Sequence, residues 1–182
     1  DAAGNSAAAT HSWYVDLTDP TVSVDAGPAD PTNSQNADFT VTSGDDQSGS
    51  SVACDIDGTA ADCATNTGVA EGAHTFTATV TDAAGNSASD SYTWLVDTTD
   101  PSVSVTGPSD PSNSADATFT VTSSDGGSGL ASTTCDLDGA AADCASASGL
   151  ADGSHTFTAT ATDAAGNGAL ASFTWLVDTT DP

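Results

Sequence analysis

The sequence predicts an all-β protein built of tandem β-sandwich domains. Apolar residues alternate with Thr and Ser in short runs, turn-forming residues separate those runs, and the whole pattern returns at a constant interval along the chain. Alternation of this kind is typical of half-buried β-strands, and no segment keeps the period of an amphipathic helix. We therefore expect several small sandwiches joined like beads, since a repeat of domain size is too long for a solenoid coil.

The repeat interval is 81 residues for most landmarks. Three landmarks recur at this interval: the motif DAAGN beginning at Asp1, Asp82 and Asp163, a Trp at Trp13, Trp94 and Trp175, and a Pro at Pro20, Pro101 and Pro182. This interval divides the chain into two complete repeats, residues 21–101 and 102–182. Residues 1–20 match only the end of a repeat, so we interpret them as the C-terminal strand and linker of a preceding, incomplete one.

Residues 1–20 leave two interpretations open. The strand that we expect at residues 7–16 carries Trp13, which an isolated strand cannot bury. The chain is then either a window on a longer tandem array or a discrete subunit whose strand inserts into a neighbouring sheet. The repeat at 102–182 already has a last strand of its own, at residues 170–177, and this favours the window.

Within residues 21–101 the predicted strands follow one another at short intervals. The apolar positions of the four clearest runs are Val22 and Val24, then Phe39 and Val41, then Phe76, Ala78 and Val80, and then Tyr92, Trp94 and Val96. Turn signals such as Gly27-Pro28 and Gly85-Asn86 separate these runs. Six or seven short strands in one repeat form the pattern of an immunoglobulin-like β-sandwich. We expect the three Trp residues to fill its core.

The chain contains no Lys and no Arg, but it has 26 acidic residues and a formal net charge of −26. Nucleic acid binding is excluded because contacts to phosphates need basic side chains. Attraction to an anionic membrane surface is excluded for the same reason. Most enzymes that clamp phosphates or carboxylates are excluded too, since they need a fixed positive charge. No apolar run is long enough for a membrane span, so we expect no direct membrane insertion.

Four cysteines form two pairs with the same spacing, Cys54 with Cys63 and Cys135 with Cys144. Each pair flanks an Asp-Gly turn signal, so a hairpin would bring its members onto neighbouring strands. We expect one hairpin disulfide per repeat, which would contribute roughly 2.5–3 kcal/mol by the chain-entropy estimate. The rival interpretation, a metal site, lacks the usual ligand spacing. Disulfides indicate an oxidising, extracytoplasmic location.

Three motifs together carry a resemblance to a known family. They are CDLDGAAADC at residues 135–144, GLADGSHTFTATATDAAGN at residues 149–167 and TWLVDTTDP at residues 174–182. This combination resembles the bacterial immunoglobulin-like repeats that occur in tandem in large secreted and surface proteins, including giant adhesins. The resemblance implies a secreted β-sandwich array that serves as a spacer, stalk or fibre. Its partners would be identical chains or neighbouring repeats in the fibre.

The acidic loops suggest a metal site between repeats. In an immunoglobulin-like sandwich the linker from the preceding repeat arrives at the end that carries two of the loops. Asp97 and Asp100 are therefore expected to approach Asp125, Asp163 and Asn167. The equivalent set one repeat earlier is Asp16, Asp19, Asp82 and Asn86, with Asp45 or Asp46.

Calcium is the cation that this set of ligands would hold, because Ca²⁺ takes six to eight oxygen ligands. The resemblance adds that similar arrays are stiffened by calcium between domains. The alternative is that these residues only build turns and linkers, since Asp and Asn bond their own backbone. Both interpretations stay open at this point.

The sequence offers no catalytic motif. His74 and His155 begin strands at the same position of each repeat, and packing or capping explains them better than catalysis. We therefore expect a protein that is not an enzyme. The predicted function is that of a rigid spacer in an extracellular filament or giant adhesin stalk, secreted and displayed at the cell surface. The alternative is a cell-surface binding module that recognises a glycan or protein through its loop ends.

Overall fold

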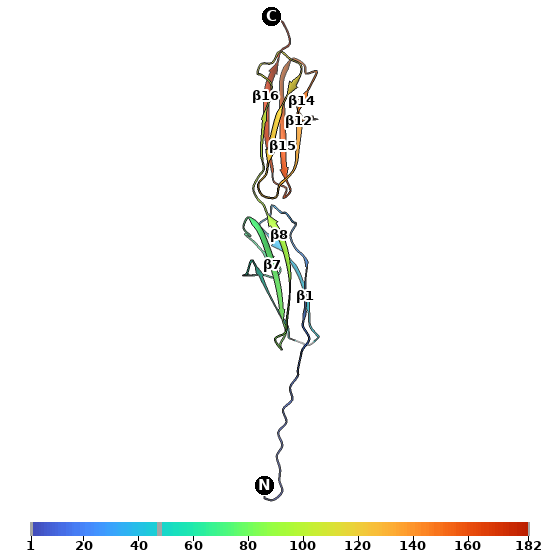
Figure 1. Ribbon diagram of the computed structural model, residues 1–182, viewed down its shortest axis with the longest axis vertical. Coiled ribbons are helices and arrows are strands. Elements are labelled where there is room, and N and C mark those ends of the chain that lie inside the picture. Colours follow the sequence, from blue (N-terminus) through green and yellow to red (C-terminus); the bar gives the residue numbers. More distant parts are fainter. Residues whose placement is uncertain (1, 47–48, 182) are drawn as a thin grey trace.

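The computed structural model describes residues 2–46 and 49–181. Figure 1 shows its strands in two groups stacked end to end, with the N- and C-termini at opposite ends. We call strands β1 to β8 the N-terminal unit and strands β9 to β16 the C-terminal unit. Within the described ranges, no helix is long and apolar enough to cross a membrane. Asp1 and Pro182, two of the repeat landmarks, lie outside the described residues, as do residues 47 and 48 of a predicted loop.

The two units contain corresponding strands in the same order. Those of the N-terminal unit are β1 (Thr21–Ala26), β2 (Ala37–Asp38), β3 (Thr40–Gly44), β4 (Ser51–Ile56), β5 (Thr59–Ala61), β6 (Thr65–Asn66), β7 (Gly72–Thr81) and β8 (Ser87–Val96). Those of the C-terminal unit are β9 (Ser102–Thr106), β10 (Ala117–Thr118), β11 (Thr120–Ser124), β12 (Leu130–Leu137), β13 (Ala140–Ala142), β14 (Ser146–Ala147), β15 (Gly153–Asp163) and β16 (Gly168–Val177). The prediction of an all-β chain is confirmed.

Each unit has one four-stranded antiparallel sheet, in the order β5-β4-β7-β8 or β13-β12-β15-β16. Two-stranded pairings complete it, β1 with β3 and β2 with β6, or β9 with β11 and β10 with β14. The long central hairpins have the same register, because Phe76 faces Tyr92 across β7 and β8 as Phe157 faces Phe173 across β15 and β16. The predicted alternation therefore gives strands of matched length and pairing in both units.

The core of each unit lies on the inner face of its four-stranded sheet. Phe76, Ala78 and Val80 of β7 are fully buried, while the Thr residues between them point to the other face. The ring of Phe39 stacks on that of Phe76 with centroids 3.8 Å apart, and Trp94 meets Phe39 edge-on at 5.4 Å. Trp94 and Trp175 are 2% and 1% exposed, so their predicted place in the core is confirmed.

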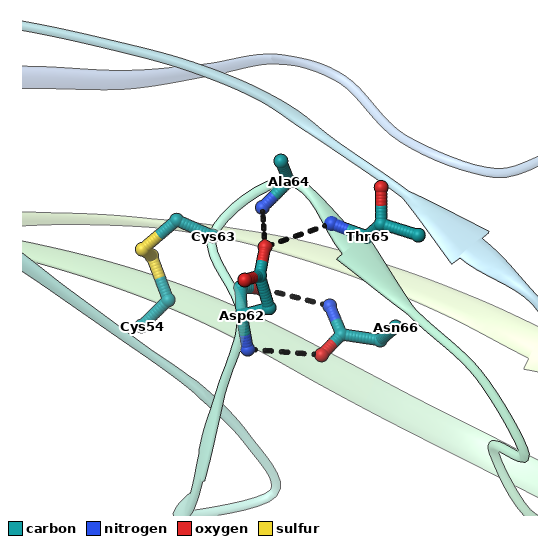
Figure 2. The surroundings of a disulfide bond; sticks show 6 residues. All are labelled: Cys54, Asp62, Cys63, Ala64, Thr65 and Asn66. Carbon is teal, nitrogen blue, oxygen red and sulfur yellow. Dashed lines mark hydrogen bonds between the residues drawn. A yellow bond between two sulfur atoms is a disulfide. The ribbon is translucent and has the colours of Figure 1, made fainter.

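Two disulfides are present, with the pairing that the sequence predicted. Cys54 bonds Cys63 and Cys135 bonds Cys144, each pair with Cα atoms 5.3 Å apart. The Asp57-Gly58 turn between β4 and β5 has positive φ at both residues, the conformation of a two-residue hairpin turn. Figure 2 shows that Cys63 sits in a bend next to Asp62, whose Oδ1 accepts the backbone N–H groups of Ala64 and Thr65.

The prediction of a strand at residues 7–16 is wrong. Residues 5–20 form neither strand nor helix, and Figure 1 shows them as an extended segment beyond the N-terminal unit. The expectation that Trp13 fills a core is wrong for the same reason, since Trp13 is 76% exposed and Leu17 is 86% exposed. Among the described residues no neighbouring sheet edge lies beside this segment, so its apolar side chains have nothing to bury against.

Candidate functional site at the junction between the units

A short linker joins the two units. It runs from Asp97, which follows β8, to Pro101, which precedes β9, and both of these residues are buried. Asp97 is only 1% exposed although it carries a carboxylate. It lies against two loops of the C-terminal unit, the one between β11 and β12 and the turn between β15 and β16. The junction is therefore a packed contact and not a free tether.

Asp97 is hydrogen-bonded to both loops. Its Oδ2 accepts the backbone N–H of Ser128 at 2.5 Å, and its carbonyl oxygen accepts the side-chain amide of Asn167 at 2.8 Å. The hydrogen bonds from Ser128 hold the pKa of Asp97 below its ordinary value. A side chain at Gly127 would not fit, because a Cβ atom there would lie 2.5 Å from the Asp97 carboxyl carbon. The loop is thus shaped around this one carboxylate.

The turn between β15 and β16 folds around Asp163. Its Oδ1 accepts the backbone N–H of Asn167 at 2.7 Å, and its Oδ2 accepts the Asn167 side-chain amide at 2.7 Å. In the other loop, Asp125 Oδ2 accepts the backbone N–H of Gly129 at 2.7 Å. Asp readily forms such local bonds to the residues that follow it in a turn. These bonds hold the carboxylates of Asp125 and Asp163 at the end of the C-terminal unit that meets Asp97 of the linker.

Three carboxylates gather at the junction. One oxygen each of Asp97, Asp125 and Asp163 lies within 4.8 Å of the other two, and Asp163 is only 2% exposed. The sequence has no Lys or Arg to balance them. The structure therefore brings together Asp97, Asp125, Asp163 and Asn167, as the sequence predicted. Asp100, the fifth member of the predicted set, is exposed and lies outside the group.

The N-terminal unit has a related group at the end where residues 16–20 enter it. Asp16, Asp45 and Asp46 have carboxylate oxygens within 4.8 Å of one another. Both carboxylate oxygens of Asp45 are buried and have no hydrogen-bond partner among the residues described. Asn86 donates to the carbonyl oxygen of Asp16 at 3.3 Å and to Asp82 Oδ2 at 2.7 Å.

Two members of the set predicted for this end lie outside the three-carboxylate group. Asp82 is linked to Asp16 only through Asn86. Asp19 is exposed and lies away from the group. In both sets, the first Asp of the linker joins the group and the later one does not. The later Asp directly precedes the buried proline of the linker, and its side chain faces solvent.

Sequence reasoning missed a third contact to the linker. Glu71, in the turn before β7, accepts the Thr98 hydroxyl at 2.5 Å and the Thr99 hydroxyl at 2.7 Å. These bonds hold the pKa of Glu71 below its ordinary value. Asp152 has the same place before β15 and accepts the hydroxyls of Thr179 and Thr180 at 2.7 and 2.9 Å. An acidic residue before Gly in both repeats, paired with a repeated Thr-Thr, was the signal available.

The two repeated histidines form a different contact, at the end of each core. His74 Nδ1 lies 2.7 Å from Asp57 Oδ2, and His74 Nε2 lies 2.8 Å from the carbonyl oxygen of Ala70. His155 repeats this with Asp138 at 2.7 Å and Ala151 at 2.9 Å. Each histidine ties the β4–β5 or β12–β13 turn to the long strand that follows, the structural role that the sequence favoured.

Comparisons with known proteins found a match to a family model and matches to several solved structures. A family model described as a bacterial Ig-like domain matches residues 102–179. No curated protein matches the chain. The fibronectin(III)-like modules of Clostridium thermocellum CbhA align with a TM-score of 0.47 and 20% identity, over 86% of this chain and 94% of that one. Bacteroides ovatus SGBP-B, in complex with a mixed-linkage heptasaccharide, aligns with a TM-score of 0.33 and 16% identity over 90% of this chain. This chain covers 48% of SGBP-B, about half its length.

Proposed function

We propose that the chain is a rigid spacer in an extracellular filament or giant adhesin stalk, since a family model described as a bacterial Ig-like domain matches residues 102–179. Residues 21–101 and 102–182 are the two tandem repeats of this spacer, each with one hairpin disulfide. The matched strand order and register of the two units support this division. The neighbouring repeats, or identical chains joined end to end, are its partners.

The observation that carries this proposal is the bonded junction. A flexible tether would leave the linker solvated, whereas Asp97 is buried and bonded to Ser128 and Asn167 of the following unit. Each such bond contributes on the order of 1 kcal/mol, and more where the acceptor is charged. Together they favour one orientation of the units over a freely jointed chain.

The proposal includes an extracellular location and a role without catalysis. The two disulfides persist only where the environment is oxidising. Both ring nitrogens of His74 and His155 are engaged in hydrogen bonds within their own unit. The repeated histidines therefore act as structural ties.

We also propose that the junction binds calcium. Asp97, Asp125 and Asp163 offer carboxylate oxygens at one place, and two of these residues are almost fully buried. Carboxylate oxygens are ligands that suit Ca²⁺, which also accepts carbonyl and amide oxygens in its shell. The group at Asp16, Asp45 and Asp46 adds support, because within residues 2–46 and 49–181 the buried Asp45 carboxylate oxygens have no hydrogen-bond partner that would compensate their burial.

Calorimetric titration of the full chain with CaCl₂ tests this part of the proposal. We expect Asp125→Asn to weaken binding by at least about tenfold, since it removes one of the charged oxygens from the ligand set. The matched control is Asp100→Asn, which removes the same charge from the exposed part of the linker and should leave binding unchanged. Equal losses in both variants would show that calcium follows the overall charge and not this site.

Small-angle X-ray scattering of the same proteins tests the spacer itself. A spacer keeps one extended length in the wild type, and the Asp125→Asn protein shows a broader range of lengths at equal calcium. The alternative, a binding module that holds a glycan or protein through its loop ends, predicts a different result. In that case the variant would keep its length. It would lose binding to a ligand that the wild type binds when screened against immobilised glycans or proteins.

A further inference from the structure

The linker after each unit adopts the same conformation. Asp97 donates its backbone N–H to the Thr32 carbonyl at 2.9 Å, and Asp178 donates to the Ser112 carbonyl at 2.9 Å. Within each linker the Asp side chain also bonds the residue two positions on, because Asp97 Oδ1 accepts the Thr99 N–H at 3.1 Å and Asp178 Oδ1 accepts the Thr180 N–H at 3.1 Å. The two linkers are thus bonded in the same way to the unit that precedes them.

The surroundings of the two linkers differ in one respect. Asp97 is buried against the C-terminal unit, whereas Asp178 is exposed and has no further unit docked on it in the part of the chain that the structure describes. The conformation is nevertheless shared. The bonds that each linker makes to its preceding unit are therefore the same, although the burial of the linker Asp differs.

An acidic side chain of the preceding unit holds each linker. Glu71 accepts the Thr98 N–H at 3.2 Å together with the hydroxyls of Thr98 and Thr99. Asp152 accepts the Thr179 N–H at 2.9 Å together with the hydroxyls of Thr179 and Thr180. In both units one carboxylate thus accepts three donors of a Thr-Thr pair. We call this contact the clamp; its carboxylate belongs to Glu71 in the N-terminal unit and to Asp152 in the C-terminal unit.

We infer that Glu71 is a positioning residue that sets the direction in which the linker leaves the N-terminal unit, so that Asp97 reaches the following unit already oriented. This inference rests on the proposed spacer function and deepens it. A linker that is ordered before docking loses less conformational entropy when the next unit packs on it. The clamp then narrows the range of orientations of the two units even when no cation is present, and a bound cation narrows it further.

Pulsed electron paramagnetic resonance on the full chain tests the inference. Nitroxide labels are attached through a ketone-bearing amino acid at the exposed positions Ser89 on β8 and Ser172 on β16, which leaves the disulfides intact. The distance distribution is recorded in EDTA for the wild type and for Glu71→Ala. We expect the Glu71→Ala distribution to be at least about twice as wide, because three hydrogen bonds that order the linker are lost.

Two further variants keep the test sharp. Asp152→Ala removes the same three bonds from the linker after the C-terminal unit, so it is the matched control and should keep the wild-type width. Thr98→Val with Thr99→Val removes two donors of the clamp while Glu71 stays in place, and it should widen the distribution as Glu71→Ala does. Unchanged melting temperatures would show that all of these proteins are folded.

The outcomes separate this inference from the spacer proposal. A narrow distribution for Glu71→Ala in EDTA would overturn the clamp. A wild type that is broad in EDTA and narrow only with CaCl₂ would also overturn the clamp, while the spacer would stand on calcium alone. A wild type that is broad under both conditions would overturn the rigid spacer itself.

Discussion

His74 faces two hydrogen-bond acceptors at once, the Asp57 carboxylate and the Ala70 carbonyl oxygen. Neither of these groups can donate, so only the doubly protonated ring satisfies both contacts. Burial opposes the charge on His74, but the hydrogen bonds to Asp57 and Ala70 outweigh it and raise the pKa. In His155 the bond to Ala151 is the main cause, and the pKa is raised as well. Asp30 is the other titratable group beside His74, and it lines the same surface depression.

The two histidines make stability depend on pH in a defined direction. A raised pKa in the folded state gives a contribution that is complete below the unfolded value of about 6.5 and is lost as pH rises through the folded value. The bonded Asp57 and Asp138 have lowered pKa values, so their part is lost only in acid, below their ordinary range. We expect a larger free energy of unfolding at about pH 6 than at about pH 9, measured by urea denaturation.

The variant His74→Gln with His155→Gln should flatten this dependence between pH 6 and pH 9. The matched control is His11→Gln, in the exposed segment before β1, which should keep the wild-type profile. A wild-type profile that is flat, or that rises toward pH 9, would contradict the doubly protonated assignment.

At the scale of strands and turns, much of the fold could be predicted because apolar and polar residues alternate with the two-residue period of a β-strand. Alternation at Phe76, Ala78 and Val80 sets which face of β7 is buried, and the Asp-Gly dipeptide sets the hairpin that brings Cys54 close to Cys63. The loops at the junction could be predicted in part, because the chain must pass from one unit to the next at that end. The approach of Asp97 to Asp163 could be predicted from this topology.

The parts that could not be predicted depend on neighbours that the sequence does not name. Residues 7–16 match the last strand of a repeat, but a strand needs a paired edge, and Trp13 stays exposed without one. Asp97 and Asp100 are two Asp residues of the same linker, yet Asp97 is buried and Asp100 is exposed. The clamp at Glu71 was hidden because Glu-Gly reads as an ordinary turn, and its partners lie 27 and 28 residues further along the chain.

The disulfide is the element whose removal has the most predictable cost. Replacing Cys135 and Cys144 together by Ser opens a loop of sequence separation 9. We expect the free energy of unfolding of the C-terminal unit to fall by roughly 2.5–3 kcal/mol, because the unfolded chain gains entropy. Hydrogen exchange of the β15 amides measures it, and the β7 amides of the intact N-terminal unit are the internal control. A loss that is equal in both units would contradict the independent cores of the two units.

The whole molecule is a rod with a large negative net charge. With 26 acidic residues and no Lys or Arg, two copies that approached side by side would repel each other along their length. Contact at the ends is different, because the junction between the units supplies backbone N–H donors to its carboxylates. Charge therefore favours extension of the rod over lateral bundling.

A rigid spacer requires that the two units keep one orientation relative to each other. Residual dipolar couplings of the full chain, with CaCl₂ in one alignment medium, measure this orientation. We expect couplings from β7 and β8 and couplings from β15 and β16 to fit one alignment tensor with equal magnitude. Two tensors of clearly different magnitude would show that the units reorient independently, and the chain would then be a flexible tether and not a rigid spacer.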